Sequence, residues 1–251
     1  MTLFAFVAQP KVARLAIDTR MMDAAAEGYC GGNQSKAHPI PHLRAVVFGR
    51  GAGAVINTVA FLLNAAGLDD IADAPDHLPD LLEQATGEVM DALDFATDTG
   101  RLGVDRMALT EEQTANAGLV MVAGYSPRAG RVVTYYATAD GGAWTVAERP
   151  PGPQPVFAPC DGLEGMGEGD GSKAHLRRIV QAQYRAVQDR TIPDAELFGD
   201  HGCGGLLTTF EVTPRGVEMG VEDAFSDAAS ARPLSRQERR KREREQAKMG
   251  V

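Results

Sequence analysis

The chain has few cysteines, and no two of them form a CxxC pair. Cys30, Cys160 and Cys203 are an odd number of thiols, widely spaced along 251 residues. A disulfide framework or a structural zinc site needs paired or clustered cysteines, so this spacing argues against both. We therefore expect free thiols, and we identify no residues for a metal or a cofactor.

Long apolar runs are also lacking. No stretch approaches the roughly 18 consecutive apolar residues that a membrane-spanning helix requires. The first residues contain no basic region followed by an apolar one, which is the pattern of a secretory signal. We expect a cytoplasmic protein that makes no membrane contact.

The negative net charge of −9 is unevenly distributed. Residues 232–251 carry eight Lys or Arg and three Glu, a balance of +5, so the other 231 residues carry −14. An acidic body is a poor binder of nucleic acid. The segment 226–251 is expected to be a separate tail, helical or disordered. It is either a solvated helix that begins at the Ser235–Glu238 capping box or an arm that contacts an acidic partner or nucleic acid.

Apolar patterns predict strands and helices in separate blocks. Prolines and glycines break the chain into short apolar runs that predict hairpins, whereas apolar residues at helical spacing predict three helices. Hairpins separated by blocks of helices favour an α+β fold of stacked antiparallel sheets over alternating βαβ units. We expect strands at 3–8, 12–17, 43–48, 118–124, 131–137, 143–147, 206–212 and 217–219, helices near 54–66, 78–97 and 173–189, and a Pro/Gly-rich insertion at 149–173.

Three residues near the start of the chain suggest a catalytic site. A threonine hydroxyl is a poor nucleophile unless a base takes its proton, and an N-terminal threonine carries such a base in its own α-amine. Thr2 becomes N-terminal if Met1 is removed. An ammonium beside that amine, here Lys36, would keep it neutral, and a carboxylate, here Asp18, would hold the ammonium in place.

Several motifs resemble one family. Asp18-Thr19-Arg20 follows Thr2 on a second strand, and Lys36 precedes a strand that ends at Gly49. The stretch 136–141 (Tyr-Ala-Thr-Ala-Asp-Gly) and the loop 200–205 (Asp-His-Gly-Cys-Gly-Gly) follow in the same order. This series resembles the β-type subunits of proteasomes and their bacterial relatives, the N-terminal-nucleophile (Ntn) peptidases. The resemblance covers about residues 2–220 and departs from the family where Cys203 stands in place of a serine.

The resemblance implies a threonine peptidase, provided that Met1 is removed. Thr2 would be the nucleophile and, through its amine, the general base, while Asp18 and Lys36 would tune that amine. The Gly49 N–H would stabilise the oxyanion of the tetrahedral intermediate. Supporting roles would fall to further residues: Asp200 and Cys203 at the amine, Arg20 and Gly51 at the substrate, and Ser172 as the weakly matched counterpart of another family serine.

The resemblance also implies an architecture and an assembly. Residues 1–225 would form a four-layer αββα sandwich, in which two antiparallel sheets are flanked by helices. The family suggests a homo-oligomeric ring that acts on peptides or proteins, and an ATPase or assembly partner. Two other functions remain open: an inactive structural or assembly protein with the same fold, and a small-molecule amidase with the same nucleophile.

Overall fold

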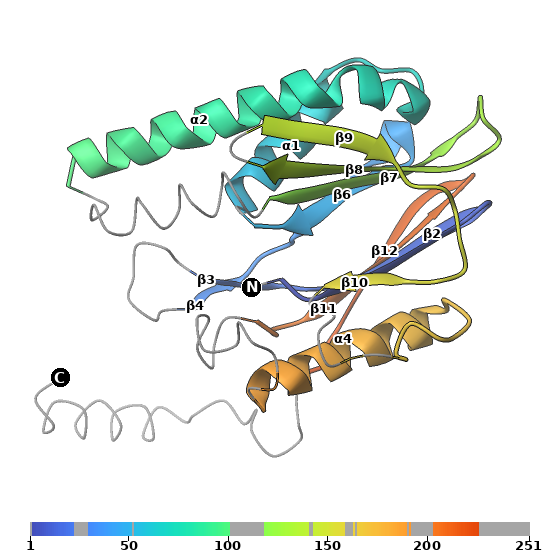
Figure 1. Ribbon diagram of the computed structural model, residues 1–251. Coiled ribbons are helices and arrows are strands. Elements are labelled where there is room, and N and C mark those ends of the chain that lie inside the picture. The colour runs from blue at the N-terminus through green and yellow to red at the C-terminus, as the bar shows by residue number, and fades with distance from the viewer. Residues whose placement is uncertain are drawn as a thin grey trace, which may run out of the picture.

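In the part of the chain that the computed structural model describes, the protein is α+β, with two five-stranded antiparallel sheets and three α-helices (Figure 1). A two-stranded ribbon lies beside them. No helix in the described part of the chain has the length and apolar character needed to cross a membrane. The structure describes residues 2–22, 30–51, 53–100, 118–140, 143–158, 163, 165–189, 191 and 203–225.

The first sheet joins the two ends of the described chain. Its strand order is β10-β1-β2-β11-β12, so the N-terminal hairpin lies directly beside the C-terminal hairpin. All pairs in this sheet are antiparallel. The strands are β1 (Phe4–Gln9), β2 (Val12–Asp18), β10 (Val156–Ala158), β11 (Leu207–Thr213) and β12 (Gly216–Glu222).

The second sheet has the order β5-β6-β7-β8-β9. Its strands are β5 (Ala37–Ile40), β6 (Ala45–Arg50), β7 (Leu119–Ser126), β8 (Arg131–Asp140) and β9 (Ala143–Glu148), and a short 3-10 helix, η1 (Pro41–Leu43), joins the first two. The ribbon consists of β3 (Arg20–Met22) and β4 (Cys30–Asn33), which lie on either side of residues 23–29.

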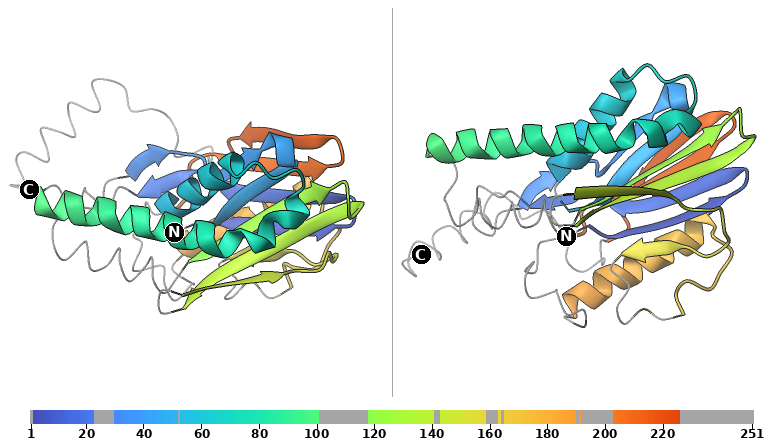
Figure 2. Two further views of the ribbon diagram at one scale, coloured as in Figure 1. Left: turned by 90° about the horizontal axis from the view of Figure 1, so that it is seen from above. Right: turned by 45° about the horizontal axis from the view of Figure 1, so that its top comes forward.

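The helices contact different sheets. Helices α1 (Gly53–Ala65) and α2 (Leu78–Asp98), with the 3-10 helix η2 (Ile71–Asp76) between them, share an apolar cluster with the second sheet. Helix α4 (Lys173–Gln188) shares another cluster with β1 and β2. Figure 1 shows the first two helices above one sheet and the third below the other, and Figure 2 shows α2 projecting past the strands.

The N-terminal hairpin is apolar because β1 is buried on both faces. Phe4 and Phe6 belong to a cluster that includes Phe48 of the second sheet, whereas Leu3 and Ala5 pack with α4. A strand that is buried on both faces has a continuous apolar sequence instead of strict alternation. This explains the apolar run at the start of the chain and fixes the position of the residues that precede β1.

Most of the predicted elements are confirmed, and their boundaries differ from those in the structure by three residues or fewer. Gly67 has a φ of +66° just after α1, as expected for a residue that ends a helix. Pro79 lies in the first turn of α2, where its missing N–H costs no helical hydrogen bond. The strand predicted at 217–219 is longer, since β12 spans 216–222.

Other elements were not predicted. The insertion expected at 149–173 contains β10, which pairs with β1 and extends the first sheet. Strands β3, β4 and β5 were also missed, because glycine or proline interrupts each of these short segments or its surroundings. The predicted irregular stretch 98–117 and the basic tail 226–251 lie mostly or wholly outside the described residues.

Candidate functional site

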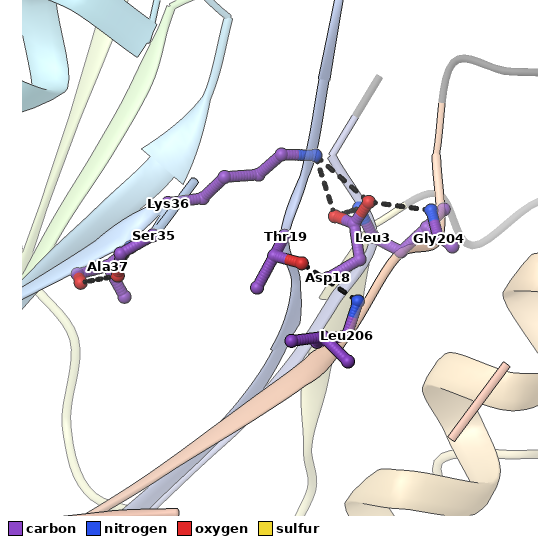
Figure 3. Close-up of polar contacts among 8 residues, drawn as sticks. All are labelled: Leu3, Asp18, Thr19, Ser35, Lys36, Ala37, Gly204 and Leu206. Atoms are coloured by element: carbon purple, nitrogen blue, oxygen red, sulfur yellow. Dashed lines mark hydrogen bonds and ion pairs between the residues drawn. The ribbon is translucent and has the colours of Figure 1, made fainter. Parts of the chain in front are cut away.

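The centre of the candidate site is a buried ion pair between Asp18 and Lys36. Lys36 Nζ lies 2.8 Å from Asp18 Oδ1 and 2.9 Å from Oδ2 (Figure 3). The side chain of Asp18 is fully buried and that of Lys36 is 5% exposed. Asp18 is the last residue of β2, and Lys36 directly precedes β5 of the other sheet, so the pair bridges the two sheets. The prediction that these two residues lie together is confirmed.

Two backbone amides complete the environment of the Asp18 carboxylate. The Leu3 N–H donates to Oδ1 at 2.9 Å, and the Gly204 N–H donates to Oδ2 at 2.9 Å. Asp18 therefore holds together residues that are 15, 18 and 186 positions away in the sequence. A buried carboxylate with this many donors is fixed in one orientation, which keeps the ammonium of Lys36 in one place.

Thr2 lies two residues before β1 and directly precedes Leu3, whose amide donates to Asp18. It is 8% exposed, so its surroundings are almost closed to water. Its neighbour Leu3 both donates to the Asp18 side chain and accepts a hydrogen bond from the Asp18 backbone N–H at 3.0 Å. These bonds hold the residue that follows Thr2 at the Asp18–Lys36 pair, and the nucleophile role of Thr2 stays a prediction.

Gly49 lies close to this group through strand register. Ala37 pairs with Phe48, so Lys36 and Gly49 are the next residues outward on neighbouring antiparallel strands. The Phe48 ring contacts that of Phe4 with centroids 5.6 Å apart, which brings the end of β6 to the start of β1. A Cβ at Gly49 would collide with the Leu119 carbonyl, so only glycine fits. The oxyanion role of the Gly49 N–H stays a prediction.

Cys203 is buried next to Gly204 and close to Asp18. Burial raises the pKa of its thiol to about 11, and the negative charge of Asp18 contributes to that rise, against the opposing positive charges of Lys36 and Arg20. The thiol is therefore protonated at neutral pH, which argues against Cys203 as a nucleophile in its own right. A thiol is also a weaker hydrogen-bond donor than the hydroxyl it replaces in the resembled family.

The remaining predicted residues have different outcomes. The Arg20 Nε is buried and has no hydrogen-bond partner in the described part of the chain. Gly51 is exposed and has a φ of +110°. Asp200 lies outside the described residues. The structure gives no ligand contact for Arg20 or Gly51, so their substrate roles stay predictions.

Ser172 is not brought to the site. It caps the N-terminus of α4 by accepting a hydrogen bond from the His175 N–H. The preceding Gly171 packs against Val7, near the far end of β1 from Thr2. Five residues of extended strand separate Thr2 from Val7, a distance of roughly 16 Å. The helix cap therefore accounts for Ser172.

Thr19 is a site residue that sequence reasoning missed. Its backbone N–H lies within hydrogen-bond distance of the Gly204 and Leu206 carbonyls, and its hydroxyl accepts the Leu206 N–H at 2.8 Å (Figure 3). Gly205 has a φ of +79°, and a Cβ there would collide with Asn33 Oδ1 and lie 2.9 Å from Thr19 Oγ1. Thr19 thus holds the Cys203–Leu206 loop against the end of β2. The only sequence signal was its place between Asp18 and Arg20.

No protein-family model matches the chain, and no curated protein matches it. Within the described residues, no group of three or more His, Cys, Asp or Glu side chains is arranged to hold a metal ion.

Proposed function

We propose that the protein is an N-terminal-threonine hydrolase of the Ntn type, a peptidase in which Thr2 is the nucleophile after removal of Met1. The observation that carries the proposal is the buried Asp18–Lys36 pair beside Thr2. Burying two charges costs several kcal/mol of desolvation per ion, so such a pair is a poor stabilising device. A charge pair of this kind in a closed site next to a hydroxyl is a candidate for catalytic work.

The architecture agrees with this proposal. Two antiparallel sheets share one apolar cluster, and helices pack against their other faces. We infer from these contacts the four-layer αββα sandwich of the Ntn hydrolases. In that fold the first strand carries the nucleophile at its N-terminal end, which is where Thr2 lies relative to β1.

The proposed reaction is acyl transfer followed by hydrolysis. The Thr2 hydroxyl oxygen attacks the carbonyl carbon of a peptide bond, and its proton passes to the Thr2 α-amine. The tetrahedral oxyanion is stabilised by the Gly49 N–H. The C–N bond then breaks, the leaving amine takes the proton, and an ester to Thr2 remains. Water attacks that ester with the α-amine again as base, releasing the acid and regenerating the hydroxyl.

Lys36 and Asp18 support the amine in this scheme. The Lys36 ammonium disfavours a second positive charge nearby, so the Thr2 amine stays neutral and able to accept a proton. Asp18 holds the ammonium by two contacts of 2.8 and 2.9 Å. Neither residue forms a covalent bond to the substrate.

The test combines the state of the N-terminus with one substitution. Mass spectrometry of the intact protein is expected to show loss of Met1. Thr2→Ala should abolish both hydrolysis of unstructured peptides and covalent labelling by a threonine-directed electrophile, whereas Thr2→Ser keeps a hydroxyl and should retain labelling. Thr145→Ala is the matched control, because Thr145 is an exposed threonine on β9.

One observation favours a second candidate, an inactive structural protein with this fold. Cys203 presents a buried, protonated thiol where the resembled family has a serine. An unlabelled wild-type protein that retains Met1 and hydrolyses neither peptides nor small amides would reject the hydrolase and leave this candidate. Hydrolysis of small amides alone would instead identify an amidase with the same nucleophile.

A further inference from the structure

Strand β12 is an edge strand with an unusual surface. Edge strands are normally protected from pairing with other chains by shortness, proline or lysine. At the other sheet edges, β5 contains Pro39, β10 spans only three residues, and β9 exposes no large apolar side chain. β12 has seven residues with neither proline nor lysine, and it exposes Met219 by 61% and Val221 by 55%.

The hairpin fixes which backbone groups of β12 face outward. Thr213 and Gly216 are the last pair before a two-residue turn, so they are a hydrogen-bonded pair of the β11–β12 ladder. Hydrogen-bonded and non-hydrogen-bonded pairs alternate in an antiparallel ladder. The N–H and C=O groups of residues 216, 218, 220 and 222 therefore point toward β11. Those of Val217, Met219 and Val221 point away from the sheet.

A second copy of β12 fits these outward groups. Met219 is the middle residue of the strand, so antiparallel pairing about a two-fold axis at Met219 gives the longest overlap. Met219 would then pair with Met219 of the second copy, and Val217 with Val221. These three residue pairs have outward-facing backbone groups on both strands, and all of their side chains are apolar.

The charges select the same register. With Met219 at the axis, Glu218 lies opposite Gly220 and Glu222 lies opposite Gly216, so no two glutamates face each other directly. Shifting the axis to Gly220 would place Glu218 directly opposite Glu222, and like charges directly opposite each other are unfavourable. Glu222 is also paired with Arg177, whose Nη1 lies 2.9 Å from Glu222 Oε2.

We propose that β12 is a dimerisation edge, through which two copies of the chain join antiparallel about Met219 and merge their first sheets into one. The strand pairing supplies main-chain hydrogen bonds, and burial of Met219 and Val221 supplies apolar contact. In the view from above, the orange β11–β12 hairpin lies along the margin of the molecule (Figure 2). This interface depends on neither the nucleophile nor any ring contact.

Two substitutions at Met219 test the interface. Met219→Lys places like charges directly opposite each other at the axis and should weaken dimerisation roughly tenfold or more. Met219→Pro removes an N–H that β11 does not use, a change that edge strands accept, and it blocks strand addition from outside. Glu218→Gln is the control: it keeps the pairing and removes a nearby negative charge, so the dimer should persist or tighten.

The measurements are sedimentation velocity and amide hydrogen exchange on the full chain, with circular dichroism to verify folding of each variant. Wild type is expected to protect the amides of Val217, Met219 and Val221 in a concentration-dependent way. Both Met219 variants should lose that protection and halve the particle mass. A monomeric wild type, or an assembly in which these three amides exchange as fast as unpaired ones, would overturn the proposal. So would folded Met219 variants of unchanged mass.

Discussion

At the residue scale, Asp18 is the group on which the candidate site depends. Its two oxygens accept hydrogen bonds from Leu3, Lys36 and Gly204, with donor–acceptor distances between 2.8 and 2.9 Å. Its removal therefore has two separable effects. The first is on the proposed catalysis, through the position of Lys36. The second is on stability, because an ammonium without its counter-charge remains in a closed interior.

Asp18→Asn is predicted to destabilise the protein by about 3–5 kcal/mol, the range typical of breaking a buried ion pair. The asparagine keeps one acceptor oxygen but leaves the Lys36 charge uncompensated. Adding Lys36→Met removes that buried charge, so the double variant should recover part of the lost stability while remaining inactive. Urea unfolding of the wild type, the two single variants and the double variant measures the coupling. A cost below about 1 kcal/mol for Asp18→Asn would show that the pair is not effectively buried.

At the element scale, the Cys203–Leu206 loop is held in place because the backbone of Gly205 lies close to the side chains of Asn33 and Thr19. Gly205 leaves no space for a methyl group, since a Cβ there would collide with Asn33 Oδ1 and crowd Thr19 Oγ1. Both neighbours come from the start and end of the β3–β4 region, far from Gly205 in sequence. The loop that supplies the Gly204 N–H therefore depends on this one glycine.

Gly205→Ala is predicted to reduce stability by about 2 kcal/mol more than Gly130→Ala, because only the Gly205 variant adds overpacking, and to reduce activity as well. Gly130 is the matched control because its φ of +64° resembles the +79° of Gly205, while a Cβ at Gly130 would meet no atom within 4 Å. Both variants incur the backbone cost of a left-handed residue, roughly 1–2 kcal/mol. Equal unfolding midpoints for the two variants would contradict the prediction.

The elements that could be predicted are those whose apolar pattern lies within the element's own sequence. β1 and β2 are apolar because they are buried on both faces, and the three helices repeat apolar residues on one side. β10 could not be predicted, because its three residues form a strand only by pairing with β1. The two strands are far apart in the sequence. β5 was missed because Pro39 argues against a strand except at a sheet edge, where β5 lies.

The residues of the candidate site also divide into those that could be predicted from the sequence and those that could not. Asp18 and Lys36 could be proposed from residue type and order, because their chemistry is visible in the sequence. The roles of Thr19 and Gly205 could not, because they consist of backbone hydrogen bonds and close contacts between segments that are far apart in the chain. Ser172 was assigned by order alone, and its position in space is set by the direction of α4.

At the scale of the whole molecule, Tyr135 links stability to alkaline pH. It is buried in β8 opposite Glu148. Burial, followed by the negative charge of Glu148, raises the pKa of its phenol to about 12, against the opposing charge of Arg131. An unfolded tyrosine titrates near a pKa of about 10. The folded state therefore favours the neutral phenol, and this contribution is complete below about pH 10 and is lost as the pH rises through about 12.

Tyr135→Phe is predicted to flatten the loss of stability between about pH 10 and pH 12, because phenylalanine has no proton to lose. The measurement is the free energy of unfolding at several alkaline pH values for both proteins. The tyrosinate absorbance that distinguishes wild type from the variant should appear with a midpoint at the raised pKa of about 12. A difference spectrum that titrates near a pH of about 10 would show that the Tyr135 hydroxyl is accessible to water.

The three donors to Asp18 have a consequence for synthesis on the ribosome. Leu3 and Lys36 leave the exit tunnel early, but Gly204 and strand β11, which pairs with β2, leave among the last described residues. Until they emerge, the β1–β2 hairpin has no β11 to pair with, and Asp18 lacks one of its amide donors. In a nascent chain, or in one truncated before Gly204, Thr2 is present but Asp18 lacks the Gly204 donor and β2 lacks its β11 partner. The proposed nucleophile therefore lacks this support until β11 has been synthesised and has paired with β2.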